Sequence, residues 1–144
     1  MTRIDFYVLD STGVSERLNF CCRLTEKAVK QGLKVLIWLE NSEQEQEVDA
    51  LLWQFKPESF IPHERIKSAE LNPKSPVALS SASDLPTGGE VLINMSTRTP
   101  ATVDRFLRIA EIVNQEKKVL NSTRQHYSNY RDQGYKITTH RLGA

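Results

Sequence analysis

The last third of the chain carries polar side chains whose spacing suits the binding of an acidic peptide. Arg124, Tyr127, Ser128 and Arg131 fall at i, i+3, i+4 and i+7 of a predicted helix, and so on one stripe of its surface. Val113, from the preceding predicted strand, would add an apolar wall and complete a small pocket rimmed by guanidinium groups. Because guanidinium groups bind carboxylates bidentately, the pocket suits an acidic peptide that ends in an aromatic residue with a free carboxylate. The alternative is that Tyr127 packs on the sheet while the arginines stay in water.

A second candidate surface is the apolar segment 51–63, which reads LLWQFKPESFIPH. Trp53, Phe55 and Phe60 lie close together in it, and its two prolines end the preceding helix near Gln54 and stiffen the backbone. One interpretation is a helix end whose aromatic rings fill the core. The other is a preformed platform for another protein, since large rings on a stiff backbone lose little entropy on binding.

Motifs for catalysis and for nucleotide binding are missing from the sequence. It contains no G-x-G-x-x-G, no G-x-x-x-x-G-K-[ST] and no G-x-S-x-G pattern. The three histidines, His63, His126 and His140, have no Glu or Cys at metal-ligand spacing. We therefore expect no catalytic residue, no metal and no cofactor. A Rossmann-type nucleotide-binding enzyme with an atypical phosphate loop remains the alternative.

The composition is that of an ordinary globular protein, with 144 residues, 39% hydrophobic residues and a formal net charge of +1. No apolar run is long enough for a membrane span, and the N-terminus lacks the apolar core of a signal peptide. Cys21 and Cys22 are neighbours on a predicted helix and point to different sides of it, which favours buried thiols in a reducing cytoplasm.

Charge is distributed unevenly along the chain. Residues 1–97 hold 10 Lys/Arg and 14 Asp/Glu, a balance of −4, whereas residues 98–144 hold 9 and 4, a balance of +5. The basic last third could attract an acidic peptide or a nucleic acid. Most aromatic residues lie in the acidic part, away from these cations, which argues against a stacking groove for nucleic acid.

Hydrophobic periodicity predicts strands that alternate with helices. The predicted strands cover 4–9, 35–39, a weak segment near 77–79, 91–94, 109–113 and 135–139. The predicted helices cover 14–31, a segment opened by the capping box Ser42-x-x-Glu45, a short stretch from Pro100 to Leu107, and 116–133. Strands that are apolar on both faces indicate a parallel sheet covered on two sides. The fold class is therefore α/β, an open, mostly parallel, Rossmann-like sheet with helices on both faces, in a single domain 1–144.

Several short motifs make the chain similar to a known family. They are FYVLD at 6–10, GLKVLI at 32–37, DALLW at 49–53, ESFIPH at 58–63, VLIN at 91–94, and Arg124-x-x-Tyr127-x-x-Tyr130-Arg131-x-x-Gly134-Tyr135. In order and spacing the chain resembles the chi subunits of the bacterial DNA polymerase III clamp-loader complex, over nearly its whole length. The ESFIPH box is the most specific of these motifs.

The resemblance implies a non-catalytic adaptor with two protein partners. Chi subunits pair with the psi subunit of the clamp loader and bind the acidic C-terminal tail of the single-stranded DNA-binding protein, so contact with DNA is indirect and there is none with a membrane. A repair helicase uses the psi surface and would exclude psi. The resemblance also implies a cytoplasmic protein of the bacterial replisome.

The resemblance assigns residues to both surfaces. The psi or helicase surface is expected at Trp53, Phe60, Ile61, Pro62 and His63. The tail pocket is expected at Val113, Arg124, Tyr127, Ser128 and Arg131. The family has a lysine at the position of Ser128, and the loss of a cation there is expected to weaken tail binding unless Arg131 compensates.

Overall fold

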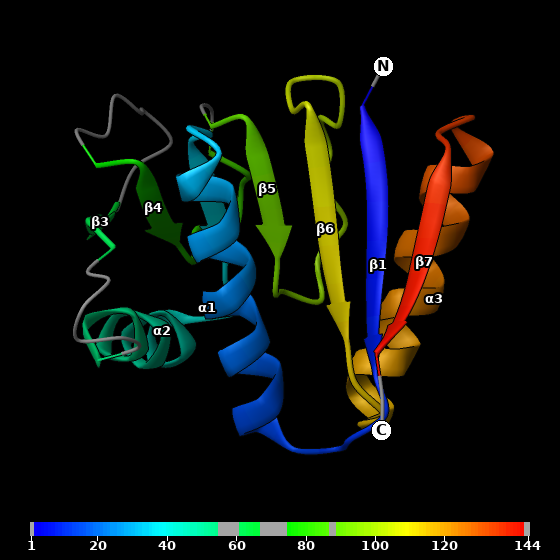
Figure 1. Ribbon diagram of the computed structural model, residues 1–144. Helices are drawn as coiled ribbons and strands as arrows, with labels where there is room; N and C mark the ends of the chain where they lie inside the picture. The colour runs from blue at the N-terminus through cyan, green and yellow to red at the C-terminus, as the bar shows by residue number, and fades with distance from the viewer. Residues whose placement is uncertain (1, 55–60, 67–74, 87–88, 143–144) are drawn as a thin grey trace.

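Seven parallel strands form one open sheet in a computed structural model, which describes residues 2–54, 61–66, 75–86 and 89–142 (Figure 1). The strand order is β3-β4-β2-β5-β6-β1-β7, and each neighbouring pair is parallel. The strands are β1 (Arg3–Leu9), β2 (Val35–Trp38), β3 (His63–Arg65), β4 (Val77–Ser80), β5 (Val91–Asn94), β6 (Arg108–Val113) and β7 (Ile137–Leu142). The predicted fold class is confirmed.

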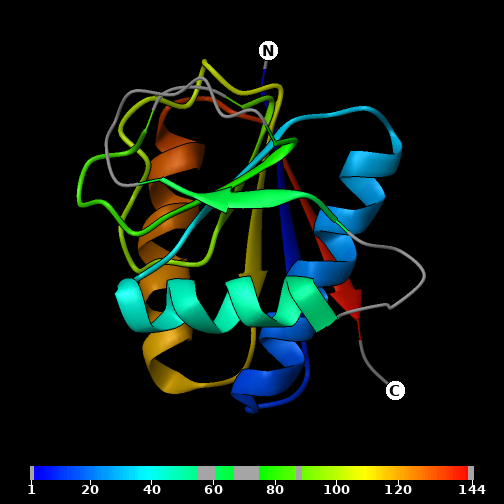
Figure 2. The same cartoon turned by 90° about the vertical axis from the view of Figure 1, so that its left-hand side faces the viewer.

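Helices cover the two faces of this sheet. They are α1 (Val14–Lys30), α2 (Ser42–Gln54) and α3 (Lys117–Asp132). Figure 2 shows α1 and α3 on opposite sides, with α2 near the carboxyl ends of the strands. Neighbouring residues of a central strand point to opposite faces, so Ile37 joins the core under α1 and α2, whereas Leu36 joins the core under α3. Apolar residues on both faces are what a doubly covered parallel sheet requires.

The connections run in opposite directions from two neighbouring strands. The chain leaves β1 through α1 toward β2, whereas it leaves β6 through α3 toward β7 on the other face. Because β1 and β6 are paired, their carboxyl ends form the point at which the topology switches. Ligands of open α/β sheets commonly bind in the crevice at such a point.

One predicted helix is absent, one strand was missed, and the last strand, predicted at 135–139, lies at Ile137–Leu142. The helix predicted from Pro100 to Leu107 was wrong: only a turn forms there, with a hydrogen bond from Phe106 N to Val103 O. The hydroxyl of Thr2, the residue before β1, donates to the carbonyl of Phe106 at 2.5 Å and lies 3.2 Å from that of Val103, so the start of the chain holds this segment in a non-helical path. Strand β3 was not predicted, because three residues are too few to show an alternating pattern.

In the part of the chain that the structure describes, no helix has the length and apolarity needed to cross a membrane.

Candidate protein-binding surfaces

Helix α3 carries the predicted stripe, and its own sequence explains where it begins and how it packs. The carboxylate of Glu116 accepts hydrogen bonds from the backbone N–H groups of Lys118 and Val119, which caps the first turn. The inner side of the helix places Val119, Leu120 and Tyr130 against the core of that face. The helix is therefore fixed on the sheet with its opposite side toward solvent.

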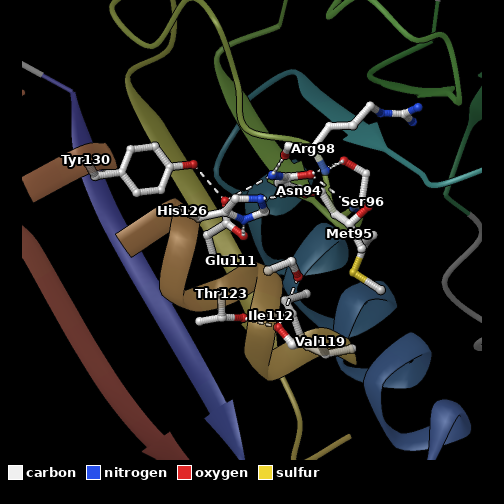
Figure 3. Close-up of polar contacts among 12 residues, drawn as sticks. Asn94, Met95, Ser96, Arg98, Glu111, Ile112, Val119, Thr123, His126 and Tyr130 are labelled. Atoms are coloured by element: carbon white, nitrogen blue, oxygen red, sulfur yellow. Dashed lines mark hydrogen bonds and ion pairs between the residues drawn. The ribbon is translucent and has the colours of Figure 1, made fainter. Parts of the chain in front are cut away.

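A buried polar network lies between α3 and the sheet, with Glu111 of β6 at its centre (Figure 3). One carboxylate oxygen is 3.0 Å from Nδ1 of His126. The other accepts hydrogen bonds from the hydroxyl of Tyr130 at 2.7 Å and the side-chain amide of Asn94 at 3.0 Å. The second ring nitrogen of His126 lies 3.0 Å from the backbone carbonyl of Thr97. These contacts join α3, β5 and β6.

The arrangement favours the protonated form of His126. The carbonyl of Thr97 can only accept a hydrogen bond, and so can a carboxylate, so both ring nitrogens bear hydrogen when His126 and Glu111 form an ion pair. Burial alone would lower the pKa of His126, but the hydrogen bond and charge of Glu111 outweigh burial and raise it. Burial and the same carboxylate raise the pKa of Tyr130 well above its usual range, so its hydroxyl remains a donor. Helix α3 is thus attached to the sheet by a buried ion pair.

The outer stripe of α3 is open to solvent. Arg124 is exposed, Ser128 is half-buried, and the side chain of Arg131 is 63% exposed. In the described ranges no carboxylate lies within ion-pair distance of Arg124, whereas Arg131 makes only a loose, exposed pair with Asp132 at 3.5 Å. The guanidinium group of Arg124 is therefore available to a partner.

Tyr127 satisfies both interpretations of the stripe. Its ring packs edge-on against Phe6 of β1 at 5.6 Å between centroids, yet the residue remains 40% exposed. Val113 lies in the same core and is only 2% exposed. Val113 therefore packs beneath the stripe. The sequence suggested that it forms the wall of an open pocket, and the structure shows no such exposed wall at this residue. The assignment of the four stripe residues and Val113 to a partner site stays a prediction.

Trp53 is the centre of the second surface, at the end of α2. It is 58% exposed, so the interpretation in which this ring fills the core was wrong. The ring meets His63 of β3 edge-on at 5.2 Å. The side chain of His63 is buried, with Nδ1 2.7 Å from Ile61 O and Nε2 3.0 Å from Asp49. His63 therefore supports the indole from below.

The other residues expected on this surface differ in exposure. Pro62 is exposed, whereas Ile61 is 3% exposed and belongs to the core under α1. Phe55 and Phe60 lie outside the described residues. Trp53 and Pro62 are thus accessible to a partner, and Ile61 and His63 hold them in place.

Comparisons with known proteins cover nearly the whole chain. A family model described as "DNA polymerase III chi subunit, HolC" matches residues 1–138. A DNA polymerase III subunit chi of Pseudomonas aeruginosa is 40% identical over 142 residues, which covers 99% of this chain and 98% of that protein. The subunit chi of Escherichia coli K12 is 26% identical over 146 residues, covering 96% and 97%.

The chain belongs to the DNA polymerase III chi subunit family. It is a non-catalytic accessory subunit of that polymerase and functions in DNA replication.

Solved structures show how the chi fold relates to other folds. T4 UvsW matches with a TM-score of 0.69 at 7% identity, over 99% of this chain and 41% of that chain. The C-terminal domain of the DEAD-box protein Dbp5 matches with a TM-score of 0.62 at 11% identity, over 97% and 90%. At such identities the likeness shows the fold alone.

The crevice at the switch point of this chi chain is ill suited to phosphate. A cavity of about 150 Å³ lies there, and Glu40, Glu116 and Arg17 are among the residues that line it. Glu116 already occupies the N-terminus of α3, where a phosphate would bind. Burial raises the pKa of Glu40, but hydrogen bonds from Thr97 outweigh burial and lower it, so this carboxylate stays ionised. Arg17 donates to the carbonyls of Ile112 and Met95. Lys118 also lines the cavity, so its two carboxylates face two cations and no net positive charge attracts a nucleotide's phosphates.

The described ranges contain neither a candidate metal site nor an accessible cysteine thiol. No group of His, Cys, Asp and Glu there could hold a metal ion. Cys21 and Cys22 are both buried, and burial raises the pKa of Cys22 to about 12, so its reactive thiolate is suppressed.

Sequence reasoning missed the Glu111 network. A charged residue in the middle of a buried apolar strand was the available signal, because such a residue needs a partner. Its partner, His126, lies 15 residues away on α3, and no periodicity links the two.

Replacing His126 by leucine is expected to lower the free energy of unfolding by about 3–5 kcal/mol, because the buried carboxyl group of Glu111 would lose its cationic partner. The folded state raises the pKa of His126. The stabilisation by His126 is therefore fully present when the pH is below the pKa of histidine in the unfolded chain, about 6.5. It is lost as the pH rises through the higher pKa of His126 in the folded protein. Urea unfolding of both proteins from about pH 6 to about pH 9 measures this difference. A difference in stability that does not shrink toward high pH would contradict the ion pair.

Proposed function

We propose that this chi subunit is an adaptor that links the clamp loader, through psi, to the acidic C-terminal tail of the single-stranded DNA-binding protein. The membership of the family supports the proposal, since chi subunits are expected to have these two partners. The observation that carries it is the exposed guanidinium group of Arg124, without a carboxylate partner in the described ranges, on a helix held by a buried ion pair.

Arg124 and Tyr127 lie one turn apart on α3 and divide the recognition of the tail between them. Arg124 binds the terminal carboxylate, a charge-assisted contact that contributes about 1.5–3 kcal/mol. The exposed part of Tyr127 offers a flat apolar surface to the tail's final aromatic ring, over the supporting Phe6 and Val113. Because the tail must lose conformational freedom on binding, the resulting affinity is modest and sensitive to salt.

Ser128 and Arg131 complete the stripe. Ser128 replaces a cation of the family with a neutral side chain, which reduces the attraction for the tail's acidic residues. Arg131 compensates in part, because its loose pair with Asp132 is readily exchanged for a carboxylate of the partner.

Psi binds the surface around Trp53 and Pro62, with Phe60, Ile61 and His63 as its neighbours. Exposed tryptophan on a supported backbone is a frequent anchor of protein interfaces. Helix α2 lies toward the β3 end of the sheet and α3 toward the β7 end (Figure 1), so the two partners do not compete. A repair helicase on the Trp53 surface would exclude psi but not the tail. In this proposal residues 1–144 act as one domain in the bacterial cytoplasm, and this adaptor reaches DNA through the tail-bearing protein.

Arg124→Ala is expected to weaken the binding of an acidic peptide ending in Ile-Pro-Phe about ten- to one-hundred-fold, because the carboxylate loses its bidentate donor. Isothermal titration calorimetry of the whole chain measures this. Lys30→Ala removes one exposed cation from α1, on the other face, and is the matched control. A peptide with an amidated C-terminus should bind the wild type as weakly as the free peptide binds Arg124→Ala. Equal affinity of Arg124→Ala and the wild type would rule out the tail site.

Trp53→Ala is expected to abolish capture of psi from a bacterial lysate and to leave capture of the single-stranded DNA-binding protein unchanged. Arg124→Ala is expected to give the opposite pattern, since each variant removes one anchor. Each variant is immobilised and incubated with the lysate, and both captured partners are detected by immunoblot. Loss of both partners from one correctly folded variant would contradict the separation of the two surfaces.

A further inference from the structure

Within the described residues, helix α1 packs over β2 and β6, and its Phe20 reaches Tyr7 of β1, whereas β7 lies beyond the helix at the edge of the sheet (Figure 1). In the register of β1 with β7, Asp5 lies beside Thr138, and Tyr7 lies beside His140. Tyr7 belongs to the core on the α1 side, so its neighbour His140 also points to this side. Strand β7 is the last strand of the sheet there.

A row of flat groups runs from α1 to β7. The guanidinium group of Arg23 lies 5.6 Å from the ring of Phe20, and Phe20 is 5.3 Å from Tyr7. The imidazole of His140 is stacked on Tyr7 at 4.7 Å and 12°. The outer face of His140 lies beyond the last strand, and its side chain is 39% exposed. The row therefore ends in a ring on which another flat group can stack.

Cations gather beside this row around one carboxylate. Asp5 is buried, and it lies 3.1 Å from Nε of Arg3, 3.1 Å from Nε of Arg108 and 2.9 Å from Nε2 of His140. Two guanidinium groups face this one carboxylate, so the positions around Asp5 keep a positive charge. The side chains of Arg3 and Arg108 are 55% and 22% exposed, so both can reach a ligand.

The region has two chemically different ends. Arg3 and Arg108 begin their strands and put the positive charge at the amino ends. At the carboxyl ends is an open hollow of about 670 Å³, whose lining includes two carboxylates, Asp10 and Glu16, together with Arg23. Because the two carboxylates would repel phosphates, charge favours a ligand phosphate only at the amino ends.

We propose that the exposed edge of the sheet at β7, with Arg3 and Arg108 beside it, binds single-stranded nucleic acid. Bases stack on His140, while phosphates are bound by Arg3 and Arg108. Aromatic rings next to cations are the shared feature of sequence-tolerant single-strand sites. An acidic peptide would use the cations but not the stack, so nucleic acid fits more of the surface.

This site goes beyond the proposed adaptor function and lies on the other face of the sheet from Arg124. The sequence argued against nucleic-acid binding because most aromatic residues lie far along the chain from the basic last third, and the fold removes this objection. The aromatic residues of the first third and the cations of the last third are far apart in the chain, but the pairing of β1 with β6 and β7 brings them together.

The test is the binding of a fluorescein-labelled oligothymidylate to the whole chain, followed by fluorescence anisotropy at low salt. His140→Ala and Arg3→Gln are each expected to weaken binding about five-fold or more, through the lost stack and the lost phosphate contact. Arg3→Gln should also reduce the slope of log affinity against log salt concentration by about 0.7. Arg141→Gln is the matched control, because it removes an exposed cation from the neighbouring position of β7, on the other face; it should change affinity less than about two-fold.

Three outcomes would overturn the proposal. The first is the absence of saturable binding by the wild type. The second is an equal loss in Arg141→Gln and Arg3→Gln, which would indicate diffuse charge attraction. The third is equally tight binding of labelled polyglutamate, which would make the surface a site for acidic protein. Circular dichroism establishes whether each variant is folded. If His140→Ala does not fold, the result for Arg3→Gln decides the test.

Discussion

The buried ion pair between His126 and Glu111 is the constraint on which the arrangement of the surfaces depends. Two charges in a protein core are costly unless their hydrogen bonds are complete, and here the carboxylate accepts from His126, Tyr130 and Asn94. Two of these donors, His126 and Tyr130, lie on α3, one turn apart. The pair therefore fixes the rotation of the helix, and with it the direction in which Arg124 and Tyr127 point.

The same network extends to the second helix of interest. Thr97, whose carbonyl faces His126, binds the carboxylate of Glu40 through its N–H and its hydroxyl, each at 2.7 Å. The N–H of Glu40 in turn donates to Gln44 in the first turn of α2. Hydrogen-bonded side chains thus line the switch-point crevice, the position where open α/β sheets commonly bind ligands. The positions left for partners are the outer surfaces of the helices and the exposed edge of the sheet at β7.

The sequence predicted those features that depend on local pattern. Apolar runs such as Val35–Trp38 predicted the parallel sheet, and helical spacing predicted that Arg124, Tyr127, Ser128 and Arg131 lie on one stripe of α3. Features that depend on pairs distant in the chain could not be predicted. The contact of Asp5 with His140 spans 135 residues, and the burial of Val113 follows from packing under α3. The helix expected from Pro100 failed because Thr2, from the other end of the chain, binds its carbonyls.

The most direct test of this account is the protonation state of His126 in the folded protein. Nuclear magnetic resonance of the protein with ¹⁵N-labelled histidine distinguishes an imidazolium, with hydrogen on both nitrogens, from either neutral tautomer. Near neutral pH we expect His126 to be an imidazolium whose two N–H groups exchange slowly with water, since both are buried and hydrogen-bonded. A neutral His126 with hydrogen on one nitrogen would contradict the buried ion pair and the fixed position of α3.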